Sequence, residues 1–190
     1  MKYPNGSNKK SNTLTTYGNR GMSLESDLNV TNEYYNSIGK AVIHKKPTCV
    51  TIHKVDYLGG RDAIIKEARF NIPSTTDYNG IYNGYYIDFE AKETNNTTSF
   101  PLQNIHIHQL EHLRNIIKHG GIGFLIVRFS KLNETYYLDG EHLFCFIDTS
   151  KRKSIPYSYF KEKGILIKEG LRPRLDYLKI VEVNCEKNKN

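Results

Sequence analysis

Apolar residues recur along the chain with two spacings, and each spacing predicts a different kind of element. A spacing of three or four residues, which lines up side chains on one face of a helix, marks two segments: residues 22–37 and 104–119. Glycine follows both segments, as Gly39 and as Gly120–Gly121, where a helix can end. We therefore predict two amphipathic helices, and a shorter one at residues 141–147.

Strands are predicted where short apolar or alternating runs lie between turn residues. These runs are residues 41–45, 48–55, 122–129 and 135–138. Residues 61–70 fit neither spacing well, so both a strand and a short helix remain open there. With 190 residues, the chain has the length of one α/β domain with an appendage.

The segment from Tyr85 to Lys92 alternates in a way that a purely structural strand would not. Successive strand side chains point to opposite faces, so Ile87, Phe89 and Ala91 form an apolar face. The other face then carries two carboxylates and an ammonium group within reach of one point, from Asp88, Glu90 and Lys92. Charges held this close cost stability unless they are compensated. A site for a divalent cation and a phosphate group would explain them.

A partner strand is predicted upstream, near Asp77. Two Asn-Gly pairs, Asn79–Gly80 and Asn83–Gly84, indicate turn positions that need a positive φ angle. Antiparallel pairing across such a turn would bring Asp77 beside Glu90. Two carboxylates and a lysine suit Mg²⁺, which prefers oxygen ligands. The alternative, for this pattern taken alone, is a solvated edge strand with an exposed ion pair.

Several motifs together resemble a known family. Asp77, Glu90 and Lys92 match the D…E-x-K signature of the restriction-endonuclease-like nuclease superfamily. The chain more closely resembles RecU-type Holliday junction resolvases of bacteria. The similar stretches are residues 3–6, 19–22, 41–48, 74–80, 87–93, 98–104, 153–155 and 173–177.

The resemblance implies an α/β fold with a mixed β-sheet flanked by helices, and a stalk that projects from it. It places the stalk at about residues 46–70, within a single nuclease domain at residues 19–185. The Asn-, Ser- and Lys-rich residues 1–18 are expected to form a flexible tail. Residues 186–190 are expected to fray.

The resemblance also implies a magnesium-dependent endonuclease, with Mn²⁺ as a substitute metal. Asp77 and Glu90 would hold the ion, and Lys92 would orient the attacking water or neutralise developing charge. Gln109 follows the E-x-K strand where the superfamily places a glutamine near that water, although an exposed amide is the alternative. Glu25, Thr75 and Gln109 are further candidate ligands. For Glu25, compensation of the helix dipole explains its position equally well.

The resemblance implies four-way junction DNA as substrate, a homodimer that nicks it symmetrically, and two protein partners, a branch-migration helicase and a strand-exchange recombinase. The formal net charge of +7 fits a polyanionic partner. The candidate DNA contacts are Arg20, Lys45, Lys46, Arg61, Lys66 and Thr76. Surface solvation is the alternative for Arg20, and pairing within the sheet is the alternative for Thr76.

The remaining features bound where the protein works. No apolar run is long enough to span a membrane, and the N-terminus lacks a signal-peptide pattern. Three widely spaced cysteines, Cys49, Cys145 and Cys185, favour reduced thiols and a cytoplasmic protein. Two other functions remain open: a restriction or repair nuclease of the same superfamily, and a non-catalytic DNA architectural protein that binds junctions.

Overall fold

The fold was analysed in a computed structural model, which describes residues 23–47, 49–57, 59, 63–70 and 75–187, with side chains up to 183. The tail expected at residues 1–18 lies outside the described residues, as do residues 188–190 of the expected frayed end.

A six-stranded mixed sheet forms the body of the protein, with the strand order β1-β4-β5-β7-β8-β10. Its strands are β1 (Val42–Lys45), β4 (Tyr78–Tyr82), β5 (Tyr85–Thr94), β7 (Ile122–Phe129), β8 (Glu134–Asp139) and β10 (Ile165–Ile167). β5 and β7 run parallel, and the other neighbours run antiparallel. Because β5 lies between β4 and β7, it is an interior strand, and the alternative of a solvated edge strand is wrong.

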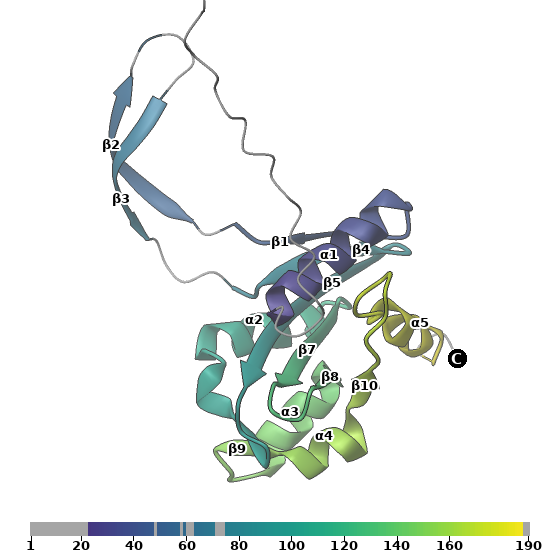
Figure 1. Cartoon of the computed structure of the whole chain (residues 1–190). Coiled ribbons are helices and arrows are strands. Elements are labelled where there is room, and N and C mark those ends of the chain that lie inside the picture. Colours follow the sequence, from purple (N-terminus) through teal and green to yellow (C-terminus); the bar gives the residue numbers. More distant parts are fainter. Residues whose placement is uncertain (1–22, 48, 58, 60–62, 71–74, 188–190) are drawn as a thin grey trace, which may run out of the picture.

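Helices cover both faces of this sheet (Figure 1). One face packs against α1 (Leu24–Ser37) and α5 (Leu178–Lys187). The other face packs against α2 (Ile107–Lys118), α3 (Gly140–Thr149) and α4 (Tyr157–Lys163). Phe89 and Phe124 stack at a centroid distance of 4.7 Å in the first core, and neither is exposed. The expected α/β fold, a mixed sheet flanked by helices, is confirmed.

The elements predicted from hydrophobic spacing are present with small differences at their ends. The predicted helices at 22–37, 104–119 and 141–147 correspond to α1, α2 and α3. The predicted strand at 122–129 has the bounds of β7. Asn104 ends a short 3₁₀ turn, η1 (Leu102–Asn104), and α2 begins only after the cap residue His106.

Two further pairs of strands lie outside the main sheet. β2 (Val50–Tyr57) and β3 (Ala63–Phe70) pair with each other and form a ribbon that stands away from the body (Figure 1). The pairing of β3 with β2 settles the open question at residues 61–70 in favour of a strand from Ala63 onward, and every residue of β3 is exposed. This ribbon occupies the segment where the stalk was expected. The second pair is β6 (Ser99–Pro101) with β9 (Ser154–Pro156).

Only one of the two Asn-Gly pairs forms a turn. Asn83 and Gly84 have φ angles of 49° and 82° and connect β4 to β5, as predicted. The turn thus lies within the predicted range 79–84, but Asn79 and Gly80 belong to β4, so the first pair does not mark a turn position. Gly80 is needed for a different reason: a Cβ atom at this position would lie 2.1 Å from the main-chain oxygen of Val42. The glycine lets β1 approach β4.

Two sequence expectations concern features beyond the sheet. Among the described residues, no helix is both long enough and apolar enough to cross a membrane. Cys49 and Cys145 are free and exposed, and the Cys185 side chain lies outside the described part.

Candidate active site

Asp77 and Glu90 lie side by side because β4 and β5 pair in the predicted antiparallel arrangement. Asp77 directly precedes β4, and the first pair of the two strands is Tyr78 with Phe89. The Asp77 backbone N–H donates a hydrogen bond to Glu90 Oε2 at 3.1 Å. The Ala91 backbone N–H donates in turn to Asp77 Oδ2 at 3.3 Å. The two carboxylates are therefore fixed by backbone groups of neighbouring strands.

Lys92 completes the group of three. Its ammonium Nζ donates to Glu90 Oε1 and lies 4.0 Å from Asp77 Oδ2. Glu90 and Lys92 project from the same face of β5, two residues apart. The single positive charge of Lys92 thus lies between two carboxylates. When both carboxylates are ionised, Asp77, Glu90 and Lys92 together carry a net negative charge.

The electrostatics of Glu90 reflect this net negative charge. Its side chain is fully buried. Burial, reinforced by the charge of Asp77 and opposed by Lys92, raises the pKa of Glu90 from 4.5 to about 8. A divalent cation would supply the missing positive charge and favour the ionised carboxylate.

The available donors fit a hard cation. Two carboxylates and the Ala91 carbonyl supply oxygen, which Mg²⁺ prefers, and water can complete its coordination. Among the residues that the structure describes, no group of three or more His, Cys, Asp or Glu surrounds one point. A soft-metal site built on histidine and cysteine is therefore not found in that part of the chain.

The raised pKa of Glu90 predicts a pH-dependent stability in buffer free of divalent cations. Below pH 4.5 the carboxyl is protonated in both the folded and the unfolded state. Between 4.5 and about 8 the folded state holds a proton that the unfolded state has lost, so this contribution to stability declines as pH rises. We expect the free energy of unfolding of the wild type, relative to Glu90→Gln, to fall between about pH 5 and about pH 9.

Urea unfolding of both proteins at several pH values measures this difference. Glu162→Gln, which removes an exposed carboxylate, is the control and should differ from the wild type by a constant amount. A constant difference for Glu90→Gln would contradict the raised pKa.

A cavity of about 260 Å³ adjoins Asp77 on the side of the sheet that α1 covers, and Glu90 is not among its lining residues. Asp77 and Ala91 line it together with Glu25 and Lys45, which form an ion pair. Glu93 also lines the cavity and accepts a hydrogen bond from the Leu24 backbone N–H at the start of α1. Sequence reasoning did not select Glu93. The sequence did contain a cue for Glu93: it directly follows Lys92, so alternation along β5 directs its side chain to the opposite face.

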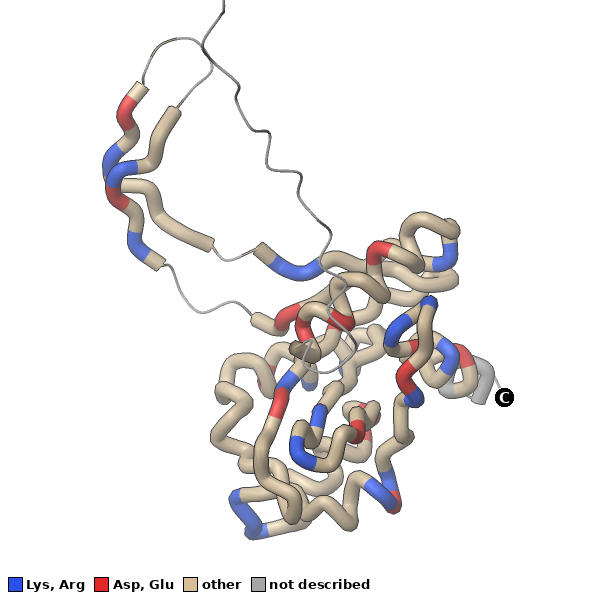
Figure 2. The backbone as a smooth tube through the Cα atoms, in the orientation of Figure 1, with Lys and Arg blue, Asp and Glu red and all other residues tan. Residues whose placement is uncertain are grey.

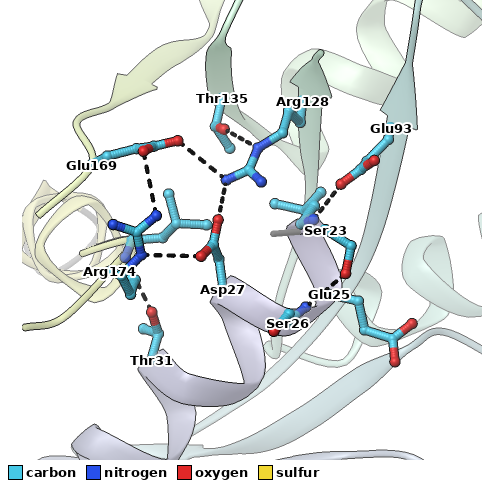
Figure 3. Close-up of polar contacts among 12 residues, drawn as sticks. Ser23, Glu25, Ser26, Asp27, Thr31, Glu93, Arg128, Thr135, Glu169 and Arg174 are labelled. Atoms are coloured by element: carbon cyan, nitrogen blue, oxygen red, sulfur yellow. Dashed lines mark hydrogen bonds and ion pairs between the residues drawn. The ribbon is translucent and has the colours of Figure 1, made fainter. Parts of the chain in front are cut away.

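A buried charge network fixes α1, and with it Glu25, against the sheet (Figure 3). Asp27 Oδ2 accepts from Arg128 of β7 at 2.7 Å, and its Oδ1 accepts from Arg174 Nε at 3.0 Å. Glu169 lies within 3.5 Å of both guanidinium groups. The Leu175 N–H donates to Thr31 one turn further along α1. The helix that carries Glu25 is thereby joined to the central sheet and to the C-terminal segment.

Gln109 has a structural partner in this structure. It is buried, and its Oε1 accepts from the His106 backbone N–H at 3.0 Å, which caps the start of α2. Among the described contacts, none joins Gln109 to Glu90 or Asp77. Its expected role near the attacking water stays a prediction.

Among the described contacts, none joins Asp88 to Asp77, Glu90 or Lys92, although Asp88 belongs to the same face of β5 as Glu90 and Lys92. It is fully buried and accepts hydrogen bonds from Lys46 and Tyr86 at 2.8 and 2.9 Å. Thr76 also donates to it, and His112 Nε2 lies 3.0 Å away. The prediction that Asp88, Glu90 and Lys92 converge on one point is therefore wrong for Asp88, because cations and hydroxyls from other elements surround it.

The four candidate DNA contacts that lie within the described residues divide into two groups. Lys45 and Lys66 are exposed, and each pairs with a carboxylate, of Glu25 and Asp56 respectively. Lys46 and Thr76 point inward toward Asp88. Figure 2 shows basic positions at the end of β1 and both basic and acidic positions along the β2–β3 ribbon. Arg20 and Arg61 lie outside the described residues.

Comparison with known proteins identifies the family of the chain. The family model described as "Recombination protein U" (RecU) matches residues 19–183. The chain belongs to the RecU family. The match to the RecU family contains Asp77, Glu90 and Lys92, all of β1 to β10, and the segment expected to form the stalk.

Curated relatives in the RecU family are similar over nearly their whole length. A "Holliday junction resolvase RecU" of Geobacillus sp. (strain WCH70) is 52% identical over 193 residues, which cover 96% of each chain. The protein of the same description from Bacillus cytotoxicus is 50% identical, over 96% of this chain and 97% of its own. That of Geobacillus kaustophilus is 51% identical and covers 96% of each chain.

Proposed function

We propose that the chain is a structure-specific DNA endonuclease that resolves four-way (Holliday) junctions in homologous recombination and DNA repair. The observation that carries the proposal is the convergence of Asp77, Glu90 and Lys92 where the start of β4 lies beside β5, at the end of the strand pair opposite to the turn. The printed names of the relatives, Holliday junction resolvases of about the same length, support the choice of substrate.

The proposed reaction is metal-dependent hydrolysis of a phosphodiester. Asp77 and Glu90 would hold Mg²⁺, or Mn²⁺ in its place, and the Ala91 carbonyl would be a further ligand. The Thr75 hydroxyl, the other candidate ligand, accepts a hydrogen bond from Lys46 at 2.9 Å, so it would have to bind the ion through its remaining lone pair. When bound, the ion polarises a phosphate oxygen and lowers the pKa of a coordinated water. Lys92 orients the water or neutralises charge that develops on the phosphate. Gln109 and Glu25 are proposed to support the site, and attack in line leaves a 5′-phosphate and a 3′-hydroxyl.

Junction resolution further requires two sites that act on equivalent strands. We propose a two-fold homodimer, because such an assembly presents two identical sites to the two equivalent strands of a four-way junction. Lys45, and Lys66 on the ribbon, are accessible for phosphate contacts. We do not assign such contacts to Lys46 and Thr76, whose polar groups are already engaged within the protein. The branch-migration helicase and the strand-exchange recombinase are the proposed protein partners, and the cytoplasm is the proposed compartment.

A substrate comparison tests the proposal. Purified protein with Mg²⁺ is given a mobile four-way junction, a flap and a linear duplex of the same sequence, and nicking of each labelled strand is followed. We expect paired nicks at symmetric positions in the junction and little cutting of the duplex. Preferential cutting of the linear duplex would identify a restriction or repair nuclease instead. Junction binding without cleavage under any divalent metal would identify a non-catalytic binding protein.

A further inference from the structure

Lys46 lies where the chain leaves the main sheet for the β2–β3 ribbon. It follows Lys45, the last residue of β1, and its backbone N–H donates to the Asp77 carbonyl at 2.8 Å. Asp77 precedes β4, to which the chain returns after the ribbon. The main chain of Lys46 therefore ties the departure point of the ribbon to its return point, at the residue that carries a proposed metal ligand.

The side chain of Lys46 strengthens the same connection. The side chain is only 14% exposed, and its ammonium group donates to Thr76 Oγ1 at 2.6 Å, Asp88 Oδ2 at 2.8 Å and Thr75 Oγ1 at 2.9 Å. An ammonium group has three N–H donors, and here each has an acceptor. Lys46 therefore holds the return segment, residues 75–77, against β5.

Asp88 explains why this lysine is buried. The Asp88 carboxylate is fully buried, and a buried charge persists only when it is paired and hydrogen-bonded. Lys46 supplies the opposite charge, while Thr76 donates to the other carboxylate oxygen. Lys46, Thr76 and Asp88 thus contact one another at the base of the ribbon, and we name these three residues the base clamp; Tyr86 and His112 also contact Asp88.

We propose that Lys46 is a positioning residue that acts through the base clamp to keep the Asp77 carboxylate in place for the metal ion. The inference rests on the proposed function. Asp77 is adjacent to Thr76 in sequence and bonds to Lys46 through its carbonyl, so movement of the return segment moves its carboxylate. Displacement of a ligand by about 1 Å is enough to impair a site of this kind.

This role differs measurably from the DNA contact that the sequence suggested for Lys46. A lysine that neutralises a phosphate contributes about 0.9 to the slope of log affinity against log salt concentration. A lysine of the base clamp contributes nothing to that slope, but its removal weakens metal binding, as loss of a residue that orients metal ligands generally does.

The test uses the full chain and four proteins: wild type, Lys46→Met, the double variant Lys46→Met/Asp88→Asn, and Lys163→Met. The double variant removes both charges of the clamp, so it leaves no unpaired buried carboxylate and stays informative if Lys46→Met fails to fold. Lys163, at the end of α4 and exposed, provides the matched loss of one surface charge. Mn²⁺ binding is measured by the loss of the free-ion paramagnetic resonance signal. Junction binding is measured without divalent metal at several salt concentrations.

We expect Lys46→Met and the double variant to bind Mn²⁺ at least about tenfold more weakly than the wild type. Their junction cleavage should fall at limiting Mn²⁺ and recover in part at high Mn²⁺, and the salt slope of junction binding should match that of Lys163→Met or exceed it. Mn²⁺ binding equal to that of the wild type in a folded variant would overturn the proposal. So would a salt slope lower than that of the control by about one. A wild type that binds Mn²⁺ but never cleaves junctions would instead refute the proposed function.

Discussion

Glu90→Gln is expected to reduce junction cleavage by about a thousandfold or more, because it removes one of two carboxylates that would hold the metal ion. Glutamine has nearly the same shape as glutamate, and the burial that raises the pKa of Glu90 to about 8 favours an uncharged group at this position. The variant should therefore fold and should bind junction DNA as the wild type does. Single-turnover cleavage and a binding titration measure the two effects separately.

The exposed carboxylate of Glu162 provides the control, and Glu162→Gln should cleave at the wild-type rate. The assignment of Glu90 to the metal site would fail if Glu90→Gln retained cleavage. It would also fail if the variant lost activity only because it unfolded, since the carboxylate would then be structural.

Asp27→Ala is expected to lower the free energy of unfolding by about 3–5 kcal/mol, the cost of removing one member of a buried ion pair. Asp27 is 1% exposed and bonds to two guanidinium groups, of which Arg128 lies on a central strand (Figure 3). Without it, the buried Arg128 and the partly buried Arg174 keep Glu169 as their remaining carboxylate partner among the described contacts.

Urea unfolding at neutral pH measures this loss, with Glu169→Gln as the comparison. Glu169 is 35% exposed and lies 3.4 and 3.5 Å from the same two guanidinium groups, so its change should cost less than about 1 kcal/mol. Equal losses for the two variants would contradict the larger contribution predicted for Asp27.

The central geometry of the site could be predicted because it follows from local rules. Alternation along β5 assigns Glu90 and Lys92 to one face, and a hairpin turn at Asn83–Gly84 fixes the pairing that brings Asp77 beside Glu90. Both depend on residues close together in the sequence. The helices and β7 were likewise predictable from the spacing of apolar residues within each segment.

The partners that come from distant segments could not be predicted in this way. Asp88 obeys the same alternation as Glu90, but Lys46 and His112, 42 and 24 residues away, draw it into another set of contacts. The pairing of Asp27 with Arg128 spans 101 residues and leaves no local pattern. Gln109 has the sequence position of a residue near the attacking water, and only the coordinates reveal that its side chain caps α2.

The isolation of the β2–β3 ribbon has a thermodynamic consequence for substrate choice. Among the described strands, β2 and β3 bond only to each other, and a two-stranded hairpin without a covering layer is marginally stable in water. The ribbon should therefore open locally far more often than β7 does, and its amide hydrogens should exchange rapidly with solvent. Under the proposed function, DNA bound by the ribbon would have to supply the free energy that orders it. DNA that makes few contacts with the ribbon would then bind weakly for two reasons: its shape does not match, and its contacts do not offset the conformational entropy that the ribbon loses on ordering.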